Sequence, residues 1–253
     1  MIIGVAAWRG MGASTTALAI AASMAARGTQ PWLVEADPAG GSLAARLELD
    51  APMAGSLERL AFPAARGTTI DRFEQAAAHV AGVRVITAPG DPFRAWGCHV
   101  PRFAWPAMLR DLDAPVVVDL GRLHGAGPNT SLLGHLDLLL LVTNADTVSL
   151  AASMEWAHRL GRTSPADAGL PLDLTRIAIV DAPIAAERVG RAEVETELGH
   201  RFAGWLPWSP DTVQLLHRGA GFTDRRVRRQ PMAAATDHLV KRLHHWLAAR
   251  EAA

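Results

Sequence analysis

Residues 2–21 read IIGVAAWRGMGASTTALAIA, and this stretch decides the fold. The apolar run over residues 2–7 is typical of a strand buried on both faces, as in parallel sheets. Residues 9–16, rich in glycine and hydroxyl groups, predict a tight loop, and residues 17–27 predict a helix that ends at Gly28. Such a loop gathers backbone N–H groups at a helix N-terminus, a geometry that favours a bound phosphate.

The rest of the chain continues the alternation of strands and helices. Further strands are predicted at residues 32–35, 83–86, 115–119, 138–143, 176–180 and 205–207. Helices fit residues 55–62, 69–79, 103–111, 147–161, 188–199, 210–218 and 235–250. This alternation predicts a doubly wound α/β fold with a mostly parallel central sheet flanked by helices. No break in composition divides the chain, so a single domain over residues 1–253 is expected, with the Pro-, Gly- and Trp-rich stretch 88–106 as an insertion or a lid.

Composition limits the class of protein. The 253 residues include 25 basic and 25 acidic side chains, and 49% are apolar, which excludes a disordered chain. The single cysteine, Cys98, has no partner for an internal disulfide, and no apolar run reaches the ~20 residues of a membrane span. We therefore expect a cytoplasmic protein. Every basic residue except Lys241 is an arginine, which excludes any mechanism that needs a lysine earlier in the chain.

The loop resembles the deviant phosphate loop of the ParA/MinD superfamily of ATPases, whose pattern is Lys-Gly-Gly-x-Gly-Lys-Thr-Thr followed by a small and apolar helix. Aligned on the paired threonines, Arg9 takes the place of the signature lysine and Ser14 that of the phosphate-binding lysine. Met11 and Ala13 replace two glycines, and Thr15 falls on the Mg²⁺ ligand. The resemblance assigns nucleotide binding to Arg9, Gly10, Met11, Gly12, Ala13, Ser14, Thr15 and Thr16.

Later segments resemble the same family in the same order. Residues 35–41, EADPAGG, are similar to its Asp-x-Asp-Pro-Gln-Gly segment, where the first acid lies near the attacking water and Mg²⁺. Glu35 and Asp37 stand at the two acids. Residues 116–121, VVVDLG, are similar to the Walker B strand, whose acid reaches Mg²⁺ through water and is Asp119 here.

The resemblance also covers the far end of the nucleotide. Residues 205–210, WLPWSP, are similar to the late segment that frames the base, which adds Pro207 to the nucleotide-binding residues. The implied cofactors are ATP or ADP with Mg²⁺. The implied metal ligands are Thr15, Asp37 and Asp119, and if hydrolysis survives, Glu35 and Asp37 are the catalytic acids.

Departures from the family pattern bear on activity. A donor to the transition-state charge is often worth ~2.7–4 kcal/mol, and Ser14 cannot replace the positive charge of a lysine. Backbone donors, the helix dipole, Mg²⁺ and Arg9 would remain. Glycine reaches positive φ freely, whereas Met11 and Ala13 reach it only with strain. We therefore expect nucleotide binding with weak hydrolysis or none.

The resemblance to TadZ/CpaE-like atypical members, which also carry non-standard loops, implies a factor that localises or assembles a larger machine, such as a secretion or pilus apparatus. It further implies a homodimer, in which Arg9 reaches the partner's nucleotide, and a protein partner. Two alternatives stay open. One is a nucleotide-free scaffold that acts through protein contacts, and the other is an active DNA-partitioning ATPase.

Surface patterns bear on these alternatives. The basic run Arg225–Arg229 is interpreted as a solvated loop or a protein contact, because zero net charge disfavours nonspecific DNA binding. The final helix has a one-sided apolar stripe, a pattern that usually packs on its own sheet, so membrane contact is not expected. Arg122 and His124 are interpreted as part of a solvated loop, and Cys98 as a structural thiol.

Four tryptophans stand in loop-like settings: Trp96, Trp105, Trp205 and Trp208. Burial is the default expectation for them. Any that is exposed would indicate a protein interface, because tryptophan is enriched among the residues that dominate such contacts.

Overall fold

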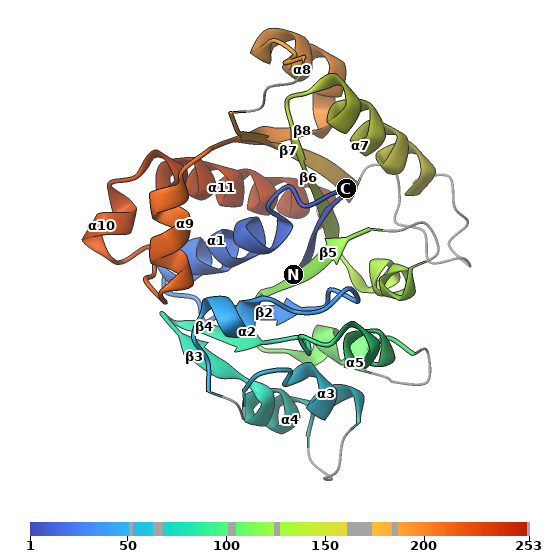
Figure 1. The fold of residues 1–253 in the computed structure, drawn as a ribbon, viewed down its shortest axis with the longest axis vertical. Helices are drawn as coiled ribbons and strands as arrows, with labels where there is room; N and C mark the ends of the chain where they lie inside the picture. Colours follow the sequence, from blue (N-terminus) through green and yellow to red (C-terminus); the bar gives the residue numbers. More distant parts are fainter. Residues whose placement is uncertain are drawn as a thin grey trace.

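The computed structural model describes residues 1–50, 53–62, 68–100, 105–123, 127–160, 174–183 and 187–251. Its strands are β1 (Ile2–Ala7), β2 (Trp32–Glu35), β3 (Ala78–Val80), β4 (Val83–Ile86), β5 (Val116–Arg122), β6 (Leu138–Asn144), β7 (Thr175–Asp181) and β8 (Phe202–Pro207). They form one sheet in the order β3-β4-β2-β5-β1-β6-β7-β8, which Figure 1 shows as the centre of the molecule. Neighbouring strands are parallel except for β3 and β4. The expected doubly wound α/β fold is therefore confirmed.

Helices cover both faces of this sheet. The α-helices are α1 (Ala13–Ala25), α2 (Leu43–Arg46), α3 (Leu57–Ala61), α4 (Thr69–Ala76), α5 (Pro92–Gly97), α6 (Trp105–Met108), α7 (Thr147–Leu160), α8 (Arg191–Leu198), α9 (Pro210–His217), α10 (Arg225–Arg228) and α11 (Pro231–Glu251). Short 3-10 turns are η1 (Leu109–Asp111), η2 (Pro128–His135) and η5 (Gly199–Arg201).

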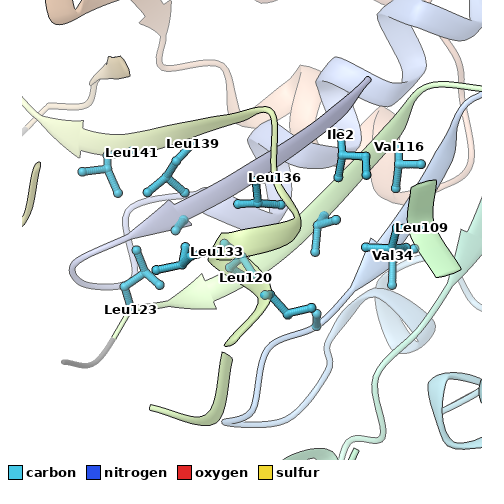
Figure 2. Packing of buried hydrophobic residues seen from close by; sticks show 14 of the residues in the cluster. Ile2, Val34, Leu109, Val116, Leu120, Leu123, Leu133, Leu136, Leu139 and Leu141 are labelled. Atoms are coloured by element: carbon cyan, nitrogen blue, oxygen red, sulfur yellow. The ribbon is translucent and has the colours of Figure 1, made fainter. Parts of the chain in front are cut away.

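Alternation along the central strands divides the core into two layers, because successive side chains of a strand point to opposite faces. In β1, Ile3 and Val5 pack in the layer that contains α1 and α11, whereas Ile2 and Ala6 pack in the other layer. Figure 2 shows this second layer, in which strand residues meet leucines from η1 and η2. The residues labelled there are Ile2, Val34, Leu109, Val116, Leu120, Leu123, Leu133, Leu136, Leu139 and Leu141.

Several predicted boundaries are wrong for local reasons. The helix expected at 69–79 ends at Ala76, and Ala78–Val80 instead form the edge strand β3. The chain turns between β3 and β4 at Ala81 and Gly82, whose φ angles are 49° and 82°. The last helix begins at Pro231 rather than 235, because proline suits the first turn of a helix.

The basic run is another correction, because Arg225–Arg228 form the short helix α10 rather than a loop. Its N-cap, Asp224, accepts a hydrogen bond from the backbone N–H of Arg226 at 2.8 Å. The start of the predicted helix at 103–111 and His124 lie outside the described residues.

The apolar stripe of α11 packs against the molecule's own sheet, as expected. Leu239, Val240 and Leu243 are buried in the layer that they share with α1 and β8. Within the described ranges, no helix is both long enough and apolar enough to cross a membrane.

Stability of the β2–β4 end of the sheet depends on Trp32, which is fully buried. Its ring meets Phe73 edge-on at 5.6 Å between centroids and carries the Arg84 guanidinium 4.0 Å from its centroid. We expect Trp32→Ala to lower the free energy of unfolding by ~3–5 kcal/mol, because it leaves a large cavity. Urea denaturation measures the loss. The control is Trp208→Ala, which removes a tryptophan that is 56% exposed and should change stability little. Equal losses in the two variants would contradict the role given to Trp32 in stabilising this end of the sheet.

Candidate functional site

A cavity of about 670 Å³ lies at the carboxyl edge of the parallel strands. In open α/β sheets this edge is where ligands bind, and the volume suits a small molecule. The cavity is lined by the loop after β1, the ends of β6, β7 and β8, and residues of α2 and α9. Its lining residues include Gly10, Met11, Gly12, Thr15, Thr16, Arg46, Asn144, Pro207, Trp208, Val213, Gln214, His217 and Arg218.

The loop after β1 needs only one left-handed residue. Gly12 has φ 90° and precedes α1, whose first turn has no side-chain cap. Elsewhere in the described chain, Glu48 and Ala81 are the only non-glycine residues with positive φ. Met11 and Ala13 therefore replace glycines without the strain that the sequence predicted. The uncapped N–H groups of α1 make this loop suitable for an anion.

The structure brings most of the predicted nucleotide-binding residues together. The predicted residues that line the cavity are Gly10, Met11, Gly12, Thr15, Thr16 and Pro207. Arg9, Ala13 and Ser14 do not line it. The Arg9 guanidinium lies 5.2 Å from the centroid of the Trp8 ring, and Ala13 is buried in the core.

Asp119 lies within the buried stretch of β5, next to the loop, whose Ser14 side chain is near it. It is fully buried, and its Oδ1 accepts the Gly121 N–H at 3.0 Å. Oδ2 has no hydrogen-bond partner among the described residues. Burial raises the pKa of Asp119 to about 6, although the Ser14 side chain, Gly121 and the charge of Arg46 favour its ionised form. A buried acceptor without a donor is costly, so Oδ2 is a position where a bound group would supply a favourable contact.

Asp37 lies beside Asp119. Its Oδ1 accepts the Ala39 N–H at 2.8 Å, and its charge raises the pKa of Asp119. Gly121 makes room for it, because a Cβ at this position would lie 2.0 Å from Asp37 Oδ2. The φ of 60° at Gly121 also favours glycine. The two predicted metal ligands at the ends of β2 and β5 are thus neighbours.

Glu35 is occupied by the backbone on both of its oxygens. Oε1 accepts the N–H groups of Ser42 at 2.6 Å and Leu43 at 2.9 Å, and Oε2 accepts that of Ala88 at 3.1 Å. The side chain is buried, and Gly41 is required beside it because a Cβ there would lie 2.3 Å from the Ala88 carbonyl oxygen. This arrangement favours a structural role for Glu35 in holding the turn that leads into α2.

Trp208, which lies in the segment predicted to frame the base, lines the cavity. The sequence interpretation did not assign Arg46, His217 and Arg218 to the site, yet they line it as well. Arg46 lies on α2, and its Nη1 is 3.3 Å from His217 Nε2 on α9. No motif marks these positions. The only available signal was that Arg46 follows the Asp-Pro turn within a few residues.

The stretch 88–106 does not form a lid in its described part. Residues 92–97 form α5, and none of residues 88–100 lines the large cavity. Cys98 is buried in the core, and burial raises the pKa of its thiol to about 12, as expected for a structural thiol. Burial lowers the pKa of the adjacent His99 to about 4, so this pair is neutral near pH 7.

Solved structures with the same fold are MinD and ParA ATPases. MinD of Pyrococcus furiosus has a TM-score of 0.74 at 18% identity, covering 96% of this chain and 98% of that chain. MinD of Pyrococcus horikoshii, complexed with Mg-ADP, has a TM-score of 0.74 at 16% identity, and the match covers 96% of this chain and 94% of that chain. A ParA-family ATPase of Chlorobium tepidum has a TM-score of 0.70 at 15% identity, and the match covers 95% of this chain and 97% of that chain. The chain therefore has the ParA/MinD ATPase fold over nearly its whole length, as the sequence resemblance implied. No protein-family model matches the sequence, and no curated protein matches it significantly.

The buried Glu35 predicts an unusual pH dependence of stability. Burial, aided by the charge of Asp119, raises its pKa from 4.5 to about 7, so the folded protein binds this proton more tightly than the unfolded chain. The resulting stabilisation is present at low pH and is lost as pH rises through about 7. We expect the free energy of unfolding of the native protein to fall by roughly 2–3 kcal/mol, relative to Glu35→Gln, between pH 5 and pH 8.

Urea denaturation of the two proteins across this range measures the difference. Histidine titrations affect both proteins alike and cancel in the comparison. Parallel pH profiles would show that Glu35 keeps an ordinary pKa in the folded protein.

Proposed function

We propose that this chain binds ATP or ADP with Mg²⁺ in the large cavity and acts as a nucleotide-responsive factor with weak hydrolysis or none. The observation that carries the proposal is the buried Oδ2 of Asp119, which lacks a protein donor directly behind the loop at the start of α1. An anion-binding loop and a carboxylate oxygen without a partner, side by side, suit a phosphate–metal ligand.

The residues at the loop fit Mg²⁺. Thr15 lines the cavity, and Asp37 and Asp119 lie together behind it. The described residues include no group of three His, Cys, Asp or Glu side chains able to hold a metal alone. Mg²⁺ commonly combines one or two protein ligands with water and phosphate oxygens, so this sparse donor set is adequate. When bound, the ion would neutralise phosphate charge, with Thr15 and Asp119 orienting it.

The opposite end of the cavity suits the nucleobase. Pro207 and Trp208 line it, and the Trp208 ring is largely exposed there. Aromatic rings stack well on bases, since every base has a π-face. A ligand spanning the cavity would thus place its base at the end of β8 and its phosphates at the loop after β1.

Three features support weak hydrolysis. The loop carries Ser14 where a lysine charge would stand, and the Arg9 guanidinium lies over Trp8, outside the cavity lining. Glu35, the acid expected near the attacking water, is saturated by three backbone N–H groups. A bound nucleotide would therefore act by stabilising one conformation of the protein more than by releasing energy through hydrolysis.

The proposed role is the localisation or assembly of a larger machine in the cytoplasm, through a protein partner. An apolar surface supports it: Phe93 and Trp96 on α5 and Phe62 after α3 are 90%, 54% and 50% exposed. The Arg94–Glu58 ion pair links the two helices. Exposed aromatic groups of this kind favour protein contacts.

The exposed Arg9 leaves room for the proposed homodimer contact with a second nucleotide. The DNA-partitioning alternative gains no support from α10, because Asp224 pairs with Arg226 and reduces the net charge of the basic run. Nucleotide-free scaffolding remains the competing outcome of the binding experiments.

Asp119 provides the direct test. We expect isothermal titration to show Mg·ADP binding to the native protein and at least a tenfold loss in Asp119→Asn, because a charged metal contact is removed. The control is Asp111→Asn, which changes an exposed carboxylate on η1 and should bind like the native protein. No heat and no thermal shift with millimolar Mg·ADP or Mg·ATP would overturn the proposal in favour of a scaffold.

Trp208 tests the base end of the cavity. Stacking on an aromatic ring is worth ~1–3 kcal/mol per base, so Trp208→Ala should weaken adenosine and ADP by the same factor, about fivefold or more. Trp96→Ala removes a similarly exposed tryptophan outside the cavity and serves as the control. Competition with a fluorescent nucleotide measures both. Unchanged affinity in Trp208→Ala would place the base elsewhere.

A further inference from the structure

The cations of the cavity do not come from the phosphate loop. Among the described residues that line it, the side chains with a permanent positive charge are Arg46 and Arg218, which belong to α2 and to the end of α9. A nucleoside diphosphate or triphosphate carries several negative charges. Backbone N–H groups orient these charges, and a paired cation adds charge-assisted hydrogen bonds about twice as strong as neutral ones.

Arg46 is a cation near the loop, in the cavity that Gly10, Gly12 and Thr15 also line. Its charge lowers the pKa of Asp119, the buried acid directly behind the loop. Arg46 also lies in the segment that follows Asp37, the neighbour of Asp119. Arg218 directly follows His217, whose Nε2 lies 3.3 Å from Arg46 Nη1, and it lines the same cavity.

The fold fixes the backbone of Arg46. Ser42 and Leu43, which begin α2, donate their N–H groups to the buried Glu35 carboxylate. The Leu43 side chain is fully buried, and the Arg46 N–H bonds to the Ser42 carbonyl oxygen at 3.0 Å. Arg46 therefore stands one helical turn beyond an anchored point.

The fold also holds the guanidinium. Arg46 Nη1 lies 3.3 Å from His217 Nε2. Burial and the charge of Arg46 lower the pKa of His217, which favours the neutral ring. Since a guanidinium group only donates hydrogen bonds, Nε2 is the acceptor in this contact. The acidic side chains near Asp119 are Glu35 and Asp37. The described contacts of Arg46 include no bidentate pair with an acidic side chain. One edge of the guanidinium fork thus stays available inside the cavity.

We propose that Arg46 is the phosphate-binding cation of this site, supplying from α2 the charge that Ser14 cannot supply from the loop. The inference rests on the proposed nucleotide function and deepens it, because it names the residue that selects phosphorylated ligands. The guanidinium fork matches the geometry of phosphate oxygens and presents two parallel donors to them. The ligand class is a nucleoside diphosphate or triphosphate, distinguished from a nucleoside by Arg46.

The experiment compares adenosine, AMP, ADP and ATP, with Mg²⁺ present, by isothermal titration against the native protein, Arg46→Ala, Arg46→Lys and Arg218→Ala. In the native protein, affinity should rise from adenosine to ADP. In Arg46→Ala the ratio of ADP affinity to adenosine affinity should fall by about tenfold or more, while the affinity for adenosine stays unchanged. Arg46→Lys should restore part of the rise, because it keeps the charge and loses the fork.

Arg218→Ala is the matched control, since it removes the same charge from the same cavity. Its loss for ADP relative to adenosine should be much smaller than that of Arg46→Ala. Thermal unfolding of each variant reports whether it folds, and the exposed position of Arg46 favours a folded variant.

The outcomes separate the two proposals. If the native protein binds ADP and Arg46→Ala keeps the full preference for ADP over adenosine, the assignment of Arg46 is overturned and nucleotide binding stands. If Arg218→Ala loses that preference instead, Arg218 is the cation that binds the phosphates and the assignment of Arg46 is again overturned. If the native protein binds none of the four ligands, the proposed function fails, and the role of Arg46 fails with it.

Discussion

The arrangement of the site depends on one buried carboxyl group. Glu35 ends β2 inside the protein, where an acid without partners would be strongly destabilising. Three backbone N–H groups from Ser42, Leu43 and Ala88 satisfy it. These contacts fix the turn after β2 and the start of α2, and they join both to the segment after β4. The cavity wall that carries Arg46 is therefore built around Glu35.

The requirement for close contact explains the glycines of this region. The Gly41 N–H bonds to the Pro89 carbonyl oxygen at 2.8 Å, and any Cβ at Gly41 would collide with Ala88. Gly121 plays the same part on β5, where it admits Asp37. These two small residues let three acids from two neighbouring strands come together, which no larger side chain would permit.

Much of the fold was predictable because periodicity and burial act locally. The continuous apolar runs at β1, β5 and β6 identify central parallel strands, and their order with the helices identifies the doubly wound topology. Short elements were missed where tertiary contacts decide the conformation. Examples are β3, which exists by pairing with β4, and α2, which Glu35 holds. The run Arg225–Arg228 became helical through a single cap at Asp224.

The candidate site was predictable where a residue belongs to a contiguous motif. The loop residues Gly10, Gly12 and Thr15 and the distant Pro207 meet at one cavity, as the family pattern implied. The pattern did not predict the environment of each side chain. The saturation of Glu35 depends on Ala88, 53 residues further along the chain. The position of Arg9 over the neighbouring Trp8 ring is a side-chain conformation that the motif does not specify. Arg46 and His217, 171 positions apart, meet only in the folded chain.

The placement of the exposed aromatic surface has a consequence for cooperativity. Phe93 and Trp96 lie on α5, a few residues after Pro89, whose carbonyl oxygen holds the turn at Gly41. A partner that shifts this segment would also shift α2 and change the cavity's affinity for its ligand. Linkage is reciprocal: the ligand would then change the partner's affinity by the same factor. The Gly41–Pro89 hydrogen bond is the physical link between the segment before the exposed aromatic surface and the turn that leads into the cavity wall.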